Sequence, residues 1–324
     1  MTSLDIIKQP IAEEFARFQK LYAECVVTDN PLLADVMDHL IQRKGKQMRP
    51  MITLLFAKLY GEIDDSAYNA ALALELLHTA SLVHDDVVDE SMERRGLPSV
   101  NSIFGNKVAV LSGDYLLATS LNYMIRANNE PMANAVAPLA QILSEGELSQ
   151  LYQSHENVVS EDVYFSIIKK KTAALFSACA KVGAIAGKAT EDQINDAALF
   201  GEYAGICFQI RDDIFDYYDS SEIGKPTGND MREGKLTLPI IYAVRNFGND
   251  RIMALIQELK DGAPSDEAIE ELIAFAKANG GIEYAEQQMA AYRQKAFDLL
   301  PKDGKPEIID AIKAHVDFVI GRNR

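Results

Sequence analysis

The sequence predicts an all-α fold, a single-domain bundle of roughly ten or more helices around a central cavity. Two observations support this class: apolar residues recur at helical spacing in nearly every segment, and alternating strand patterns are hard to find. The chain has 324 residues, of which 48% are hydrophobic, and this is enough to bury a large core. We expect one domain over residues 1–324, in which residues 1–30 form an N-terminal helical extension.

The predicted helices of the first half of the chain are bounded by recognisable stop signals. An apolar stripe marks the first helix, and Gly61 ends the second. The third is long and apolar and carries three aspartates at its C-terminal end. In chain order, we expect helices at residues 31–42, 49–60, 66–89, 106–127, 131–154 and 160–186.

In the second half, Thr190 and Gln193 have the spacing of a capping box and open a helix that ends near Tyr218. Polar, turn-forming residues follow it. Long irregular segments in compact domains tend to be functional, so we expect residues 219–234 to form a catalytic loop. Helices then resume and continue to the C-terminus, with breaks near residues 262–264, 279–281 and 301–306.

Two copies of one acidic motif carry most of the functional information. The first acidic motif is Asp85, Asp86 and Asp89, and the second is Asp212, Asp213 and Asp216. On a helix this spacing places the carboxylates on one side, where like charges repel one another. Hard divalent cations prefer oxygen ligands, and Mg²⁺ commonly bridges protein carboxylates to a substrate phosphate. The two motifs therefore predict Mg²⁺ held between the protein and a phosphate, with the motifs on different helices across a shared cavity.

Composition excludes several other functions. The formal net charge of −16 argues against a nucleic-acid surface and against docking on anionic lipid, because both recruit Lys and Arg patches. Three widely spaced cysteines form neither a disulfide framework nor a zinc motif. The N-terminus lacks the features of a signal or transit peptide, and no apolar run has the length of a membrane span. We expect a cytoplasmic protein.

Further motifs accompany the acidic ones in a fixed order. They are Gly45-Lys46-Gln47-Met48-Arg49-Pro50, His84, Arg94-Arg95-Gly96, Lys171-Thr172, Phe208-Gln209 and the segment from Lys225 to Asp230. In this order, from about residue 31 to the end, the chain resembles the trans-isoprenyl diphosphate synthases. The resemblance implies a polyprenyl synthetase domain with the isoprenoid synthase type of fold. It also implies a prenyltransferase that joins isopentenyl diphosphate head-to-tail to an allylic diphosphate through a carbocation.

The resemblance also implies roles for individual residues around the allylic diphosphate. Asp85, Asp86, Asp89 and Asp212, with Asp213 and Asp216 indirectly, would hold about three Mg²⁺ ions on this leaving group when substrate is bound. Because diphosphate departure develops negative charge, cations around it should supply much of the rate enhancement. The cationic contacts implied for the same group are Arg94, Lys171, Lys225 and Lys235.

A second set of residues is implied for the other substrate and for the carbocation. The positions matching the isopentenyl diphosphate site are Gly45, Lys46, Arg49, His78 and Arg95. The planar guanidinium of an arginine suits this task, since it donates two hydrogen bonds at once to phosphate oxygens. Thr172 and Gln209 match polar groups that face the carbocation. By contrast, we expect His84 to be a hydrogen-bonded core histidine.

Residues just before the first acidic motif help to predict the length of the product. Ala80 and Ser81 lie five and four positions before Asp85, where short-chain relatives place aromatic stoppers, and both are small. We therefore expect a medium or long all-trans product for quinone side chains, of about eight isoprene units (octaprenyl) within roughly six to ten, drawn forward by burial of apolar surface. Candidates for the residue that ends the tunnel are Leu74, Leu77, Leu121, Tyr123 and Met124.

Alternative functions remain open at this point. One is a short-chain farnesyl or geranylgeranyl diphosphate synthase. Another is a metal-dependent phosphohydrolase, since His84-Asp85 also resembles the metal-binding doublet of that class, and a third is a non-catalytic partner subunit. The resemblance further implies a homodimer with residues 106–127 at its interface. It allows transient membrane contact for product release, without a membrane span.

Overall fold

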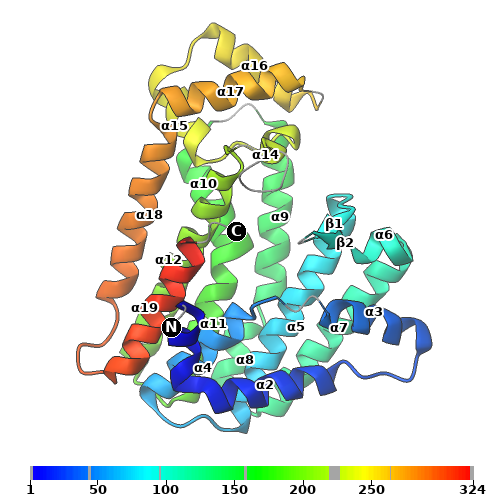
Figure 1. Ribbon diagram of the computed structural model, residues 1–324, viewed down its shortest axis with the longest axis vertical. Coiled ribbons are helices and arrows are strands. Elements are labelled where there is room, and N and C mark those ends of the chain that lie inside the picture. Colours follow the sequence, from blue (N-terminus) through cyan, green and yellow to red (C-terminus); the bar gives the residue numbers. More distant parts are fainter. Residues whose placement is uncertain are drawn as a thin grey trace. The chain divides into compact units, whose positions relative to one another are not determined.

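The computed structural model (Figure 1) describes residues 3–42, 45–94, 96–156, 159–218, 227–262 and 264–321, except for the side chain of His155. Within these residues the regular structure is almost entirely helical, as predicted. The exception is a small antiparallel hairpin of two short strands, β1 (Glu93–Arg94) and β2 (Leu97–Pro98), which the sequence analysis missed.

The chain divides into two compact units. Unit 1 comprises Met1–Pro138, Ala178–Ala198 and Pro301–His315, and unit 2 comprises Leu139–Ser177, Leu199–Leu300 and Val316–Arg324. Three helices contain residues of both units: α11 (Ala174–Ala186), α12 (Glu191–Phe215) and α19 (Pro306–Ile320). The single-domain organisation expected from the sequence stays a prediction.

Unit 1 is organised around α5 (Asp65–Val88). This helix packs along α7 (Asn106–Ala127) and also contacts α2, α4 and α6, so apolar residues are buried along its length (Figure 1). The side chain of Asp64 caps its N-terminus by accepting hydrogen bonds from the amides of Ser66 and Ala67. The remaining helices that lie wholly in this unit are α1 (Ser3–Lys8), η1 (Gln9–Ile11), α2 (Ala12–Cys25), α3 (Pro31–Ile41), α4 (Met48–Tyr60), α6 (Val100–Phe104) and α8 (Glu130–Val136).

Unit 2 has its own apolar core, to which α12 contributes Ile206, Ile210 and Ile214. Helix α15 packs against both α17 and α18, and α16 packs against α17 (Figure 1). The helices wholly in this unit are α9 (Leu139–His155), α10 (Glu161–Ile168), the π-helical turn η2 (Lys169–Ala173), α14 (Asn229–Arg232), α15 (Leu238–Phe247), α16 (Asp250–Lys260), α17 (Asp266–Ala278) and α18 (Gly281–Asp298).

Most predicted helix boundaries are confirmed. Helix α7 has the predicted bounds, and the capping box before α12 is present, with the Thr190 amide donating to Gln193 Oε1 at 2.9 Å. The helix predicted at residues 131–154 is wrong, because α8 ends at Val136 and α9 begins at Leu139. Pro138 explains this break, since proline has no amide hydrogen to donate within a continuous helix and its ring clashes with the preceding turn.

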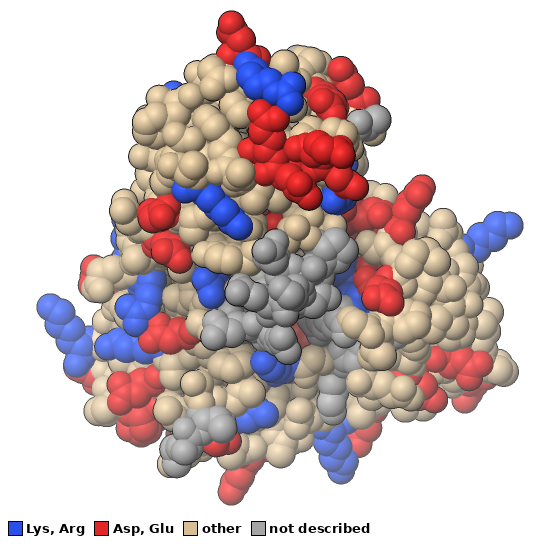
Figure 2. Space-filling model, turned by 45° about the horizontal axis from the view of Figure 1, so that its top comes forward, with Lys and Arg blue, Asp and Glu red and all other residues tan. Residues whose placement is uncertain are grey.

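The surface reflects the acidic composition. On the face shown in Figure 2, Lys and Arg side chains stand singly or in small groups among acidic ones. In the part of the chain that the structure describes, no helix combines the length and the apolar character needed to cross a membrane.

Candidate active site

The first acidic motif lies at the C-terminal end of α5, as predicted. Asp85 and Asp86 belong to the last turn, and Asp89 is the C-cap residue. Asp86 is buried, whereas Asp85 and Asp89 are partly exposed. The last turn contains no basic residue, so these carboxylates meet the negative end of the helix dipole and are locally unfavourable. A cation bound at this helix end would relieve the unfavourable electrostatics.

Arg94 supplies part of that positive charge. Its Nε donates a hydrogen bond of 2.6 Å to Oδ1 of Asp86, whose residue is only 3% exposed. The loop that returns Arg94 to α5 is fixed by Asn101, whose Nδ2 donates to the carbonyl oxygens of Asp86 and Ser91, and by Ser99, whose hydroxyl donates to Ser91. Sequence reasoning missed Asn101 and Ser99, although Ser99 could be recognised as the N-cap of α6. The predicted site residue Arg95 lies outside the described residues.

The segment before α4 has an unusual backbone. Gly45 has φ of 57° and Gln47 has φ of 51°, and the left-handed region is costly for a residue with a side chain. Gln47 is buried and accepts a hydrogen bond from Gln19, while buried His315 donates to the carbonyl of Met48 at 2.8 Å. Neighbouring helices therefore hold this strained segment in place, as is common at binding sites.

Arg49 and His78, two residues predicted to bind isopentenyl diphosphate, contact each other. Arg49 Nη1 lies 2.8 Å from His78 Nε2. A guanidinium can only donate, so Nε2 of His78 is the acceptor and carries no proton in this arrangement. Lys46, from the same predicted set, is exposed on the adjoining turn.

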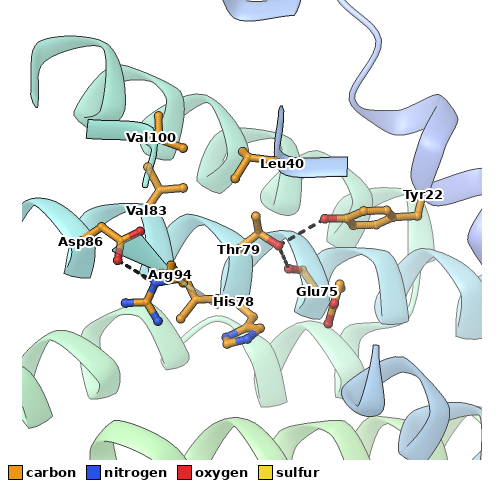
Figure 3. A pocket seen from close by; sticks show the side chains of 10 residues that line it. Tyr22, Leu40, Glu75, His78, Thr79, Val83, Asp86, Arg94 and Val100 are labelled. Carbon is orange, nitrogen blue, oxygen red and sulfur yellow. Dashed lines mark hydrogen bonds and ion pairs between the residues drawn. The ribbon is translucent and has the colours of Figure 1, made fainter. Parts of the chain in front are cut away.

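Residues predicted for both substrates line one cavity of about 60 Å³ in unit 1. Figure 3 shows the Asp86–Arg94 pair at one end of this cavity and Tyr22 at the other, with His78 between them. Tyr22 contacts the Thr79 hydroxyl at 3.2 Å, and that hydroxyl donates to the carbonyl of Glu75. The full lining is Tyr22, Leu40, Glu75, His78, Thr79, Leu82, Val83, Asp86, Arg94 and Val100.

His84 has a packing role. Its Nε2 donates to the carbonyl of Val110 at 3.2 Å and lies 3.4 Å from Asp114. Its ring packs directly against α7 at Gly113, where an added Cβ would lie only 2.2 Å from Nε2. The imidazole is therefore turned toward α7 and is hydrogen-bonded, as expected, but it is only partly buried and does not lie in the core.

In unit 2, three predicted site residues form one hydrogen-bonded chain. Thr172 Oγ1 donates to Gln209 Oε1 at 2.6 Å, and Gln209 Nε2 donates to Asp213 Oδ1 at 2.8 Å. The other carboxylate oxygen of Asp213 accepts a 2.6 Å hydrogen bond from the hydroxyl of Tyr164. Sequence reasoning missed Tyr164, because a tyrosine in an apolar helix gives no signal beyond core packing.

The surroundings of the second motif disfavour the ionised form of its buried carboxylates. Desolvation raises the pKa of Asp213 to about 7, and repulsion from Asp212 and Asp216 adds to this, while the hydrogen bonds from Tyr164 and Gln209 oppose it. Desolvation also raises the pKa of Asp216 and of Asp230, and neighbouring carboxylates contribute at both. A cation placed here would favour the ionised forms.

Asp216 connects the second motif to α14. Its two oxygens accept hydrogen bonds from the amides of Asn229, at 2.9 Å, and Asp230, at 3.0 Å. The carboxylate thus satisfies amides at the start of α14 that have no partner within the helix. Of the lysines predicted on this side, Lys235 forms an ion pair with Glu233, and Lys225 lies outside the described residues.

Lys171 lies on the π-helical turn η2, within the predicted continuous helix. Its Nζ is 2.6 Å from Glu147 and 3.3 Å from Gln150, both on α9. Two glycines allow close packing of this turn, since a Cβ at Gly146 would lie 2.8 Å from the Lys171 amide nitrogen and one at Gly205 would lie 2.6 Å from the Cα of Ala173. Single π turns occur frequently at functional sites, and this one displays Lys171 and Thr172.

The acidic motifs fit Mg²⁺ by donor type. Among the described residues, no group of three or more Asp, Glu, His or Cys side chains is already gathered as a metal centre. However, the donors are carboxylate oxygens, which hard cations prefer. Asp85 and Asp89 are partly exposed and Asp212 is exposed, and burial, with repulsion from neighbouring carboxylates, raises the pKa of Asp213 and of Asp216.

The predicted chain-length residues lie along α5 and α7. Leu74, Leu77 and Ala80 are buried on α5, and Ser81 is partly buried, with its hydroxyl donating to the carbonyl of His78. On α7, Met124 is buried, Tyr123 is partly buried and Leu121 is 54% exposed. The part that each plays in product length stays a prediction.

Comparisons with known proteins agree with this arrangement. The family model for polyprenyl synthetase matches residues 30–275. An octaprenyl diphosphate synthase of Haemophilus influenzae is 33% identical, covering 100% of this chain and 98% of the relative. A crystal structure of geranylgeranyl pyrophosphate synthase from Bacteroides thetaiotaomicron is 46% identical with a TM-score of 0.86, covering 99% of this chain and 100% of that one. A crystal structure of a decaprenyl diphosphate synthase from Rhodobacter capsulatus is 37% identical with a TM-score of 0.92, covering 99% of each chain. The chain belongs to the polyprenyl synthetase family.

Proposed function

We propose that this trans-prenyltransferase condenses isopentenyl diphosphate with an allylic diphosphate and releases a medium or long all-trans polyprenyl diphosphate. The observation that carries the proposal is the cavity in unit 1, which is lined by His78 from the predicted isopentenyl diphosphate side and by Asp86 and Arg94 from the predicted allylic side. A condensing enzyme needs two anionic substrates next to each other, and this lining supports that arrangement.

The reaction breaks the allylic carbon–oxygen bond and forms a new carbon–carbon bond. The departing diphosphate takes the bonding electron pair, the double bond of isopentenyl diphosphate attacks the carbocation, and the released diphosphate accepts the proton that is then lost. Arg94, Lys171, Lys225 and Lys235 bind the leaving diphosphate and stabilise its growing charge. The oxygens of Thr172 and Gln209, which share a hydrogen bond, stabilise the carbocation.

Mg²⁺ dependence is general in this family. In our proposal Asp85, Asp89 and Asp212 provide direct ligands. Asp213 and Asp216 act indirectly through their contacts with Gln209 and α14. Asp86, which the resemblance places among the direct ligands, is moved to the indirect group because it is buried and bonded to Arg94. When bound, about three Mg²⁺ ions would neutralise the diphosphate and make it a better leaving group.

On the isopentenyl diphosphate side, Gly45, Lys46, Arg49, His78 and Arg95 form the proposed site. The turn that contains Gly45 and Gln47 carries Lys46, and the contacts of Gln47 with Gln19 and of Met48 with His315 hold the start of the helix that carries Arg49. When isopentenyl diphosphate binds there, Arg49 would either leave His78 for the phosphate oxygens or keep that contact and donate its other hydrogen bonds to them.

Product length is the finer part of the proposal, with about eight isoprene units as the expected value. The small side chains of Ala80 and Ser81 support a long product. A four-unit product is the second candidate, favoured by the 46% identity to a structure described as a geranylgeranyl pyrophosphate synthase.

Ala80→Phe should shorten the product to about three or four units by blocking the growing chain. An unchanged product in a folded A80F variant would exclude Ala80 from the path.

A homodimer is also part of the proposal, with α7 at the interface. This helix exposes four large apolar side chains, those of Val110, Leu111, Leu121 and Ile125. Exposed apolar side chains gathered on one element can mark a protein interface. Sedimentation velocity should report a dimer, and Leu111→Glu combined with Ile125→Glu should convert it to a monomer; a wild-type monomer would contradict this assignment.

The function is tested by following the carbon product. The protein is incubated with Mg²⁺, farnesyl diphosphate and radiolabelled isopentenyl diphosphate, and the products are separated by reversed-phase chromatography. We expect labelled polyprenyl chains longer than the primer. Release of phosphate from the allylic substrate with no label in a longer chain would instead support the phosphohydrolase alternative.

A further inference from the structure

Lys260, the last residue of α16, is a buried lysine outside the predicted site. Only 5% of it is exposed, and its Nζ donates hydrogen bonds to the carbonyl oxygens of Gln153, at 2.7 Å, and Gly234, at 3.0 Å. Lysine is almost never fully buried without a specific partner. Desolvation lowers the pKa of Lys260 to about 8, with the charge of Glu156 acting in the opposite direction. The fold therefore accepts an energetic cost to keep an ammonium group here.

The two carbonyls that Lys260 joins belong to different parts of unit 2. Gln153 lies in the last turn of α9, at the negative end of the helix dipole, which favours a cation. Its carbonyl also accepts the amide of Glu156 at 3.2 Å. Gly234 lies in the turn between α14 and α15. This glycine has φ of 70°, and a Cβ on it would lie 3.1 Å from the carbonyl oxygen of Ser154. The turn is thus seated directly on the end of α9.

The segment from Asn229 to Lys235 is fixed from two sides. At its start, the Asp216 carboxylate accepts the amides of Asn229 and Asp230. At its end, Lys260 holds Gly234, and the neighbouring Lys235 amide donates to the Asp230 carbonyl at 2.8 Å. Lys260 and the second acidic motif therefore hold opposite ends of the short segment that carries Lys235.

We propose that Lys260 is a positioning residue for the allylic diphosphate site: it fixes the turn at Gly234 on the end of α9 and thereby places Lys235 beside the second acidic motif. This inference rests on the proposed function, in which Lys235 contacts the leaving diphosphate. The ammonium of Lys260 touches neither substrate in this account. It acts through the backbone of Gly234, one residue before Lys235.

Lys260→Met is the primary test, since methionine keeps the apolar stem but removes the ammonium that donates to the carbonyls of both Gln153 and Gly234. Misplacing a charged group by about 1 Å can cost up to about 100-fold in rate. We expect kcat/KM for farnesyl diphosphate to fall about 10- to 100-fold, with KM for isopentenyl diphosphate changed less than about twofold. Amide hydrogen exchange at residues 229–235 should accelerate.

Ile256→Val, a buried change on the same helix, is the matched control. It should lower stability modestly without accelerating exchange at residues 229–235 or altering the kinetics beyond about twofold. If I256V reproduces the K260M exchange pattern, the effect belongs to α16 packing and the proposal fails. If a folded K260M variant exchanges and reacts like the wild type, the proposal is also overturned.

A double-mutant cycle with Lys235→Ala tests whether Lys260 acts through Lys235. Non-additive losses of kcat/KM in K235A, K260M and the double variant are the expected result, and additive losses would contradict it. If K260M does not fold, Gly234→Ala displaces the same turn while keeping Lys260, and it should give the same kinetic pattern; wild-type kinetics would refute the proposal. Failure of the wild type to form any prenyl product would refute the proposed function instead, and the exchange experiment would still test whether Lys260 fixes the turn.

Discussion

The two acidic motifs have the same sequence spacing but are stabilised in different ways. Both lie where a long helix ends, and neither helix has a basic residue in its last turn. In the first, the buried carboxylate of Asp86 is paired with the guanidinium of Arg94. In the second, the buried carboxylate of Asp213 receives its hydrogen bonds from the neutral groups of Tyr164 and Gln209, and its pKa is raised to about 7. A carboxylate bonded to a cation is already compensated, whereas one bonded to neutral donors still favours the addition of a cation.

This difference indicates a division of labour within each motif. One buried aspartate connects each motif to its surroundings: Asp86 bonds to Arg94 of the hairpin, and Asp213 bonds to Tyr164 of α10 and, through Gln209, reaches the η2 turn. The more exposed aspartates are Asp85, Asp89 and Asp212, and in our proposal these three contact the metal-bound diphosphate. The comparison therefore predicts that substitutions of exposed members affect activity and that substitutions around buried members affect stability.

The largest expected effect is on activity. Asp85→Asn and Asp212→Asn should each lower kcat by about 100- to 1,000-fold, because each removes a charge that acts on the leaving group. Their melting temperatures should remain close to that of the wild type. Steady-state assays with farnesyl and isopentenyl diphosphates measure the effect, and Asp192→Asn, an exposed acid at the start of α12, is the control. Near-wild-type activity in D85N or D212N would contradict the catalytic role assigned to the exposed aspartates.

A smaller effect is expected from Arg94→Met on the stability of the first motif. This change leaves the buried Asp86 carboxylate without its cation and should lower the free energy of unfolding by about 2 kcal/mol, a value discounted because Arg94 is partly exposed. Urea denaturation of the metal-free protein measures it. Adding Asp86→Asn to R94M should recover part of the loss. If R94M is as stable as the wild type, the Asp86–Arg94 pair does not anchor the hairpin.

The second motif should respond to pH. A carboxyl group whose pKa is higher in the folded than in the unfolded protein contributes stability below its unfolded pKa and loses it as pH rises through the folded value. The metal-free protein should therefore lose stability from about pH 4 to about pH 7 through Asp213, by at most about 1.4 kcal/mol per pH unit for one group.

Thermal unfolding in EDTA across this range measures the slope, and Asp213→Asn should reduce it. Addition of Mg²⁺ with inorganic pyrophosphate should also flatten it, since a bound cation favours the ionised carboxylates. A slope that is the same in D213N and the wild type would show that other groups cause the pH dependence.

Tyr164→Phe should give the smallest effect. It removes one of the two side-chain hydrogen bonds to Asp213 while Gln209 remains, so we expect a loss of about 1 kcal/mol in unfolding free energy. The variant should also shift the Asp213 pKa further upward, because the Tyr164 hydroxyl lowers it. Carboxyl-detected NMR titration would report this shift. A downward shift would contradict the role given to the tyrosine.

The elements that the sequence predicts well are those set by local signals. The capping box at Thr190 and Gln193, the bounds of α7 and the placement of the first acidic motif at a helix end follow from side chains near in sequence. The break at Pro138 was missed, although proline is a local signal, because the apolar period continues across it.

The site was harder to predict wherever it depends on contacts between distant segments. Tyr164 and His315 are separated from their partners by 49 and 267 residues, and neither has a sequence context that indicates a hydrogen bond. The π turn at Lys169–Ala173 depends on packing against Gly146 and Gly205. Spacing within a helix can predict which aspartates share a face, but it cannot predict which one will be buried.

The most direct test of the central claim is a crystal structure of the protein with Mg²⁺ and a non-hydrolysable allylic diphosphate analogue. Our account predicts metal ions coordinated by Asp85, Asp89 and Asp212, all contacting the same diphosphate, with Asp86 still bonded to Arg94 and Asp213 to Tyr164. A diphosphate bound without metal, or metal ions on one acidic motif while the aspartates of the other point into solvent, would contradict it.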